Sequence, residues 1–189
     1  MNTPAHAILN LAILSRKQKP DWNPLIIWGA LIPDITMFIF YLWLKLATDI
    51  PERQIWGEEY YRPFWQLTFD FFNSIPLALL GLGVMVYARR TGMALLFASI
   101  LLHCFEDLPL HHDDGHRHFW PFSNFRFESP VSYWDPNHYG VIASRIETGL
   151  VLLASVYVFR RVRSPWTKGL LIVANALPFA AQLYFSLNG

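Results

Sequence analysis

Cysteine and charge are both scarce in this chain of 189 residues, and each scarcity excludes a class of protein. The one cysteine, Cys104, rules out an internal disulfide. Charged residues make up only 15% of the chain, the formal net charge is +1, and no basic patch is present, so nucleic acid is not an expected partner. The sequence also has no basic segment followed by an apolar run and a small-residue cleavage site, so we expect no cleavable leader.

Hydrophobic residues are abundant instead, at 53% of the chain, with 16% aromatic residues. A short helix is expected over residues 5–15, and longer apolar segments cover 25–47, 67–88, 92–108, 140–160 and 166–187. Since a helix of roughly 20 residues spans a bilayer, these segments predict about five crossings. We therefore expect an all-α fold, with residues 1–189 forming a single polytopic membrane helix bundle. A soluble all-helical domain is the alternative, because shorter apolar stretches also form buried core helices.

One carboxylate interrupts the apolar segment 25–47. Asp34 follows Pro33 about ten residues into that segment, where an unpaired charge is costly in lipid and normally faces a partner or a polar cavity. We expect Asp34 to be a metal ligand. The alternative is that it caps the second half of a helix broken at Pro33. Residues 48–66 are expected to be a loop, and their tryptophans and tyrosines are expected to form an interfacial aromatic belt.

Six of the seven histidines fall between His103 and His138. His103 and Asp107 are four residues apart, which places both on one face of a helix and lets them bind one divalent ion such as zinc. Glu106 lies close to the same face. Further ligand types follow within a few residues: His111, His112, Asp113, Asp114, His116 and His118. The alternative is a solvated polar loop whose histidines cap helix ends or pair with nearby carboxylates.

Polar and basic residues separate to opposite sides of the predicted bundle. When successive segments alternate in direction, one side collects Asp70, Asn73, His103, Asp107, Arg145 and Glu147. The other side collects Arg89, Arg90, Arg160, Arg161, Arg163 and Lys168. By the positive-inside rule the basic side is cytoplasmic, so the loop rich in histidine and aspartate faces outward and the site lies on the extracytoplasmic side.

Three separated motifs carry a resemblance to a known family. The order TPAHAILN, GALIPD and then His-x-x-x-Asp followed by WPFS resembles the membrane-bound metal-dependent hydrolases linked to the LexA regulon. The run LHCFEDLPLHHDDGHRHFWPFSNFRFESPVSYWDPNHYG is most similar to an uncharacterised subgroup of bacterial membrane proteins. The resemblance implies a helical protein of the bacterial inner (plasma) membrane with a hydrolytic metal site, distantly similar to zinc-dependent phospholipase C.

The resemblance also implies particular ligands. His6 matches the family's N-terminal histidine, Asp34 its Leu-Pro-Asp carboxylate, and His103 with Asp107 its central pair. This chain lacks the family's His-Arg-Gly and Thr-His-Ser element between them, where Asp70 could substitute as a ligand. The dense loop could compensate through the histidines His111, His112 and His116.

Two further residues are candidates for catalysis. Glu147 could be another ligand or a general base, and Arg145 could bind an anionic substrate oxygen. The alternative is that both are interfacial charges. The sequence thus predicts a hydrolase that uses a divalent metal, expected to be zinc, on an ester or phosphoester of a small molecule or a membrane lipid. A non-catalytic metal-binding membrane protein, such as a sensor or transport accessory, and a purely structural bundle are the alternatives.

The topology can be tested by thiol labelling. In a Cys104→Ser background, we expect Asn124→Cys to react with an impermeant thiol reagent on intact cells, because residues 111–139 are predicted to face outward and Arg89 and Arg160 the cytoplasm. Labelling of position 124 only after lysis would contradict this orientation.

Overall fold

The computed structural model describes residues 1–162, 165, 167–169 and 171–176, and this part of the chain is helical, with no strand. Its elements in order are α1 (Thr3–Leu14), η1 (Pro20–Trp22), α2 (Asn23–Ala47), α3 (Glu52–Gly57), η2 (Glu59–Tyr61), α4 (Pro63–Phe72), α5 (Ile75–Tyr87), α6 (Thr91–Asp107), η3 (Pro136–His138) and α7 (Gly140–Arg161), where η denotes a short 3-10 turn. The expected all-α fold is confirmed.

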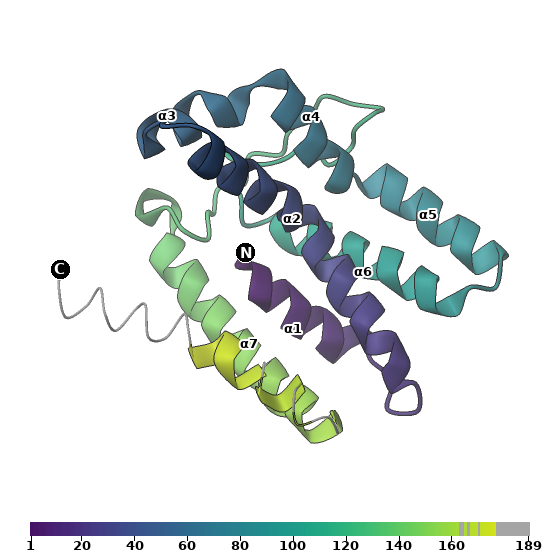
Figure 1. Cartoon of the computed structure of the whole chain (residues 1–189). Helices are drawn as coiled ribbons and strands as arrows, with labels where there is room; N and C mark the ends of the chain where they lie inside the picture. The colour runs from purple at the N-terminus through teal and green to yellow at the C-terminus, as the bar shows by residue number, and fades with distance from the viewer. Residues whose placement is uncertain (163–164, 166, 170, 177–189) are drawn as a thin grey trace.

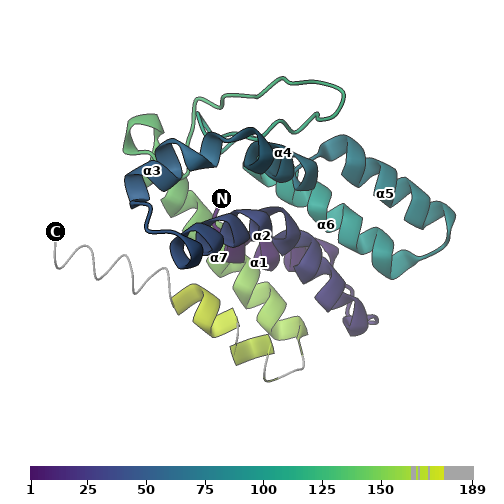
Figure 2. The same ribbon diagram turned by 45° about the horizontal axis from the view of Figure 1, so that its top comes forward.

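Helix α1 occupies the centre of the bundle and packs against α2, α6 and α7 (Figure 1). Helix α5 lies beside α6 and runs antiparallel to it, while α4 packs on α2 (Figures 1 and 2). The start of α1 and the loop 108–139 lie at one end of the bundle, and the α1–α2 and α5–α6 connections lie at the other. The short first helix is thus buried by its neighbours, and its N-terminal turn is delivered to the end that carries the histidine-rich loop.

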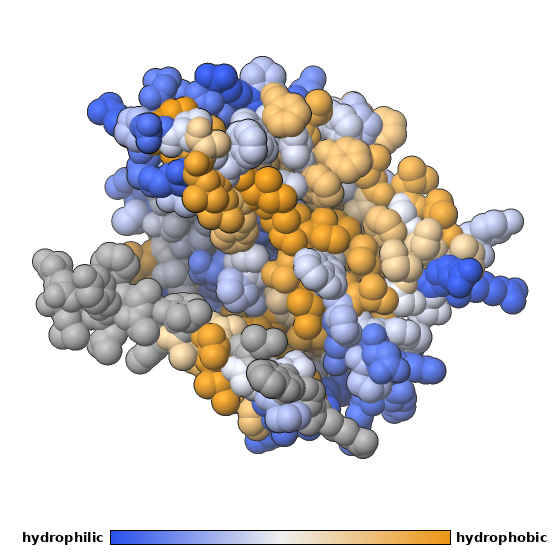
Figure 3. Space-filling view, viewed as in Figure 1, coloured by the Kyte–Doolittle hydropathy of each residue, from blue (hydrophilic) through white to orange (hydrophobic). Residues whose placement is uncertain are grey.

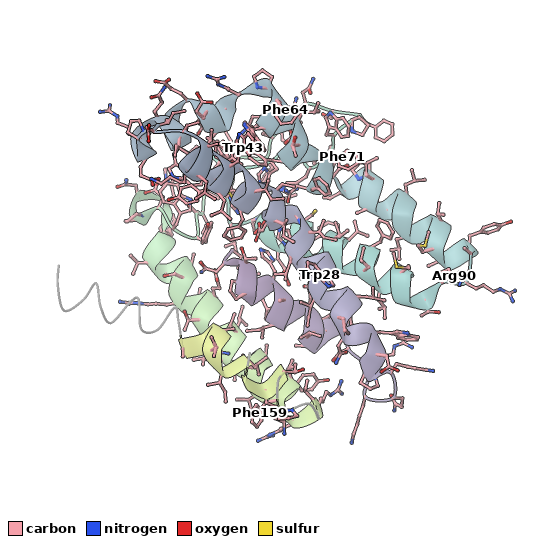
Figure 4. All side chains as sticks on the ribbon, in the orientation of Figure 1. Trp28, Trp43, Phe64, Phe71, Arg90 and Phe159 are labelled. Carbon is pink, nitrogen blue, oxygen red and sulfur yellow. The ribbon has the colours of Figure 1, made fainter. Side chains whose placement is uncertain are left out.

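Three described helical segments are long and apolar enough to cross a membrane: Pro20–Ala47, Pro63–Tyr87 and Gly140–Arg161. Large apolar side chains such as Trp28, Trp43, Phe64 and Phe71 project outward (Figure 4), although soluble proteins rarely expose extended apolar patches. Apolar residues form a broad band across the face in Figure 3, with hydrophilic residues toward its ends. The count of three is lower than the expected five, because α6 has only 17 residues and most of 166–187 lies outside the described residues.

One alternative and one expectation about helix boundaries are wrong. Helix α2 continues through Pro33. A proline removes only one helical N–H, and the packing of α2 against α1, α4 and α6 holds the helix together. The expected single helix over 67–88 instead divides at residues 73–74. There Ser74 Oγ caps α5 by accepting from the Leu77 amide at 3.2 Å.

Residues 48–66 also differ from the expected loop. They contain α3, η2 and the start of α4. Ile55 and Tyr60 from this region are buried against Phe40 and Leu44 of α2 and Phe69 of α4. The aromatic residues there therefore contribute to a second core beneath the histidine-rich end as well as to the surface.

Helices α1, α2 and α6 are joined by a buried polar layer. Asn10 Nδ2 donates to the Ser99 hydroxyl at 2.8 Å, and Ser99 Oγ donates to the Ile26 carbonyl at 2.6 Å. Gly29 permits this close approach, because a Cβ there would lie 2.3 Å from the Leu96 carbonyl oxygen. The layer fixes the positions of the three helices along one another. The residues four positions further along each helix, toward the histidine-rich end, lie in the site.

This packing predicts a large effect of one methyl group. We expect Gly29→Ala to lower the free energy of unfolding by about 1–3 kcal/mol, because the backbone of Leu96 must move away. Gly83→Ala is the matched control, since a Cβ at Gly83 meets nothing within 4 Å and alanine favours a helix. Thermal unfolding of the two variants in the same detergent measures the difference. Equal midpoints would mean that α2 and α6 are not in close contact.

Candidate metal centre

Two imidazoles converge on one carboxylate in the interior of the bundle. His6 Nε2 lies 3.0 Å from Asp107 Oδ1, and His103 Nε2 lies 3.0 Å from Asp107 Oδ2. The two histidine side chains are fully buried and Asp107 is 3% exposed. Among the described residues, these three form the group whose ligand atoms could hold a metal ion. The four-residue spacing of His103 and Asp107 indeed places them together, and α1 supplies the third donor.

The second ring nitrogen of each histidine is already engaged. His6 Nδ1 lies 2.7 Å from Glu106 Oε2, and His103 Nδ1 lies 2.8 Å from the Ala30 carbonyl. Because a carbonyl only accepts, His103 Nδ1 carries a hydrogen, and Nε2 is the ring nitrogen left to bind a metal ion. Both Nε2 atoms are buried without a well-aligned hydrogen bond in the described part of the chain. Histidines that ligate metals have this arrangement, with the second N–H donated to a carboxylate or carbonyl.

A proton competes with a cation for this site. Burial lowers the pKa of His6, but Asp107 and Glu106 outweigh it and raise the pKa to about 9. In the absence of a metal ion, His6 is therefore positively charged near pH 7 and pairs with Asp107. Binding of a metal ion through Nε2 would displace that proton, so it would be favoured as the pH rises.

Two other candidate ligands border the group. Asp34 is 7% exposed; its Oδ1 lies 3.6 Å from His103 Nε2, and its Oδ2 accepts from Thr3 Oγ1 at 2.5 Å. His111 Nε2 lies 3.4 Å from Asp107 Oδ1. Met1 also reaches this region, with its amino nitrogen 2.7 Å from Asp107 Oδ1. The structure thus brings Asp34 and His111 beside the three central residues.

His111 is held by acidic neighbours. Its Nδ1 lies 3.0 Å from Asp114 Oδ1. Burial lowers the pKa of His111, but the nearby carboxylates of Asp107 and Asp114 outweigh it and raise the pKa to about 9. The loop backbone is fixed nearby, because the Ser129 amide donates to the His111 carbonyl at 3.0 Å. His111 therefore lies between two carboxylates, but its contact with Asp114 lacks the alignment of the hydrogen bond between His6 and Glu106.

The remaining loop histidines have other partners. His112 Nδ1 lies 2.7 Å from the Ser129 carbonyl, and the His112 ring stacks on His138 with centroids 3.7 Å apart. His116 is buried; burial first, and then the charges of His118 and His111, lower its pKa to about 3. Neither His112 nor His116 belongs to the three-residue group.

Asp70 is engaged elsewhere. Its Oδ1 accepts from the Arg117 amide at 2.8 Å, and its Oδ2 accepts from Arg117 Nε at 2.5 Å. The side chain of Asp70 is fully buried, and this pairing with Arg117 offsets the cost of burying it. In the structure, Asp70 therefore anchors the histidine-rich loop to α4.

Glu147 and Arg145 are separated by the helix that carries both. Glu147 is 6% exposed, and its Oε1 accepts from the Asn2 amide at 3.1 Å and from Asn2 Nδ2 at 2.7 Å. Its Oε2 is buried without a hydrogen-bond partner among the described residues. Arg145 is exposed on another side of α7. The structure therefore does not bring the two proposed catalytic residues together.

Sequence reasoning missed the groups that orient the site. Glu106 was noticed only as a neighbour of the His103 face, whereas its carboxylate contacts His6 across 100 positions of the sequence. The Ala30 carbonyl could not be found from side-chain patterns at all. Asn10 could have been found from the sequence, because it lies four residues after His6 and so on the same face of the helix.

No family model, curated protein or solved structure matches this chain. The resemblance to membrane-bound metal-dependent hydrolases therefore stays a prediction.

The contact between Glu106 and His6 predicts an effect on metal affinity. We expect Glu106→Ala to weaken metal binding by about 10- to 100-fold, because His6 loses the partner that orients its ring. Glu128→Ala removes an exposed glutamate and should leave the affinity unchanged. Competition with a chromophoric chelator measures both variants. Equal metal affinities would show that Glu106 does not orient His6 as a metal ligand.

Proposed function

We propose that this chain is a multi-pass membrane protein that binds a divalent metal ion, zinc by our expectation, through His6, His103 and Asp107. The observation that carries the proposal is the convergence of two buried Nε2 atoms on one carboxylate, with both Nδ1 atoms already engaged. A structural ion pair would need only one imidazole for this carboxylate. The second imidazole, stacked on the first with centroids 3.7 Å apart, supplies a further donor for a cation.

The donor set suits zinc. Two imidazole nitrogens and one carboxylate oxygen are common zinc ligands, and three protein ligands leave a fourth position for water or substrate. Cys104 does not compete, because its buried Sγ contacts the Asn73 carbonyl at 3.4 Å. The charge of Asp107 offsets part of the charge of a divalent ion in these low-dielectric surroundings.

The activity that we propose is hydrolysis of an ester or phosphoester. A divalent ion with an open position supplies Lewis acidity toward water and the substrate oxygen. Within the chain, Glu106 would orient His6, and Thr3 would fix the Asp34 carboxylate. Glu147 is our candidate base, because its Oε2 has no partner among the described residues and Asn2 holds its other oxygen.

One observation favours the non-catalytic alternative. Asp34 and His111 lie 3.6 and 3.4 Å from atoms of the central group, close enough for small shifts to bring them to an ion. Five protein ligands would close the coordination, as expected of a sensor or transport accessory rather than an enzyme.

The proposed location is the bacterial inner membrane, with lipid as a partner and the site on the extracytoplasmic side. Three apolar helices of spanning length support a membrane protein. The connections opposite the site carry Arg16, Lys17, Lys19, Arg89 and Arg90. By the positive-inside rule, this distribution favours a cytoplasmic position for that end.

Metal content tests the proposal. We expect His103→Ala and Asp107→Ala to abolish bound metal in detergent-purified protein, because a helix holds this pair in one geometry that no loop residue can restore. His118→Ala should retain most of it, since His118 Nδ1 contacts the Asn73 carbonyl at 3.0 Å and lies outside the group. Elemental analysis decides between these outcomes. Unchanged metal in Asp107→Ala would remove the central claim.

Hydrolysis by the same preparations separates the two functions. The wild-type protein should cleave p-nitrophenyl acetate or bis-p-nitrophenyl phosphate in a reaction that a chelator stops and zinc restores. Glu147→Gln should reduce turnover while leaving the metal content unchanged. Full metal content without metal-dependent turnover of either probe would favour the non-catalytic alternative.

A further inference from the structure

An apolar groove runs along α7 on the side that faces α1. It has a volume of about 680 Å³ and lies between α1, α7 and the helical residues 171–176. Its walls are mainly aliphatic and aromatic, with Ala5 from α1, Val151, Val156 and Phe159 from α7, and Ile172 opposite. The volume is in the range of ligand-binding pockets, roughly 300–1,000 Å³.

One end of this groove is polar. Asn2 and Glu147 line it there, and Asn2 satisfies only one of the two carboxylate oxygens. Glu147 Oε2 is buried with no hydrogen-bond partner in the described ranges. A buried carboxylate oxygen without a donor is costly, so Glu147 would be stabilised by turning this oxygen toward a ligand in the groove that donates a hydrogen bond.

The shape of the groove restricts the rest of that ligand. The lining residues Glu147 and Phe159 are twelve positions apart on α7, about 18 Å along a helix. Leu152 and Val156, on the same wall, are 52% and 53% exposed, and α7 is a candidate membrane span. A long alkyl chain could therefore enter from the lipid phase and lie along the helix.

We propose that this groove binds a neutral amphiphile with one alkyl chain and a hydroxyl-bearing head group, whose hydroxyl donates to Glu147 Oε2. The inference rests on the proposed function, since it names the substrate class: a neutral ester lipid, held near the metal centre by the segment of Met1 to Thr3. In this assignment Glu147 binds the head group of the lipid and is not the base. Asn2 contacts Glu147, while its neighbours contact Asp107 and Asp34. A phosphate head group is disfavoured at this end, because it would meet the Glu147 carboxylate.

Native mass spectrometry of the full chain released from detergent tests this binding. The chelator-treated protein should bind 1-monopalmitoylglycerol in a one-to-one complex. Methyl palmitate has the same chain but no donor, and it should bind at least about tenfold more weakly, the difference expected for a hydrogen bond to a charged group. Equal binding of methyl palmitate would overturn the role of Glu147.

Two tryptophan variants locate the ligand. Val156→Trp should block the groove and abolish the complex, whereas Leu153→Trp, also on α7 and 72% exposed but outside the groove, should bind normally. Glu147→Gln should lose the preference for the hydroxyl compound over the methyl ester. Equal binding by the two tryptophan variants would overturn the site. Because the protein is free of metal in this assay, loss of lipid binding and loss of metal binding are separate results.

Discussion

The rest of the structure depends on the buried carboxylate of Asp107. A carboxylate at 3% exposure in an apolar bundle is stable only with positive or hydrogen-bonding partners, and here His6, His103 and His111 all approach it. This requirement explains the position of α1, which is too short to span a membrane and yet occupies the centre of the bundle. Its first turns bring His6 to Asp107, and its apolar residues then fill the space between α2, α6 and α7.

The helices reach this arrangement because their polar residues recur every four positions. Asn10 and His6 follow one face of α1, while Ser99, His103 and Asp107 follow one face of α6. The Ile26 and Ala30 carbonyls of α2 accept from Ser99 and His103 respectively. Each turn of the three helices thus adds one polar contact, and Gly29 allows the helices to come close enough for these contacts. The site is the last layer of this packing.

Local spacing predicted the part of this site that lies on one helix. His103 and Asp107 could be paired from their separation alone, and an acid in an apolar segment indicated that Asp34 is shielded from lipid. The all-α fold followed from the apolar segments. Spacing could not rank the loop histidines, because their partners are distant: His112 stacks on His138, and His118 contacts the Asn73 carbonyl. Asp70 looked like a ligand because its partner, Arg117, is 47 positions away.

The central claim is that His6, His103 and Asp107 bind one metal ion together. X-ray absorption spectroscopy at the zinc edge of the purified, zinc-loaded protein tests it most directly, because imidazole gives a distinct outer-shell signal and sulfur a longer bond than nitrogen or oxygen. We expect at least two imidazoles and oxygen donors, no sulfur, and one imidazole fewer in His6→Ala where zinc is retained. A spectrum with sulfur from Cys104, or one that His6→Ala leaves unchanged, would contradict it.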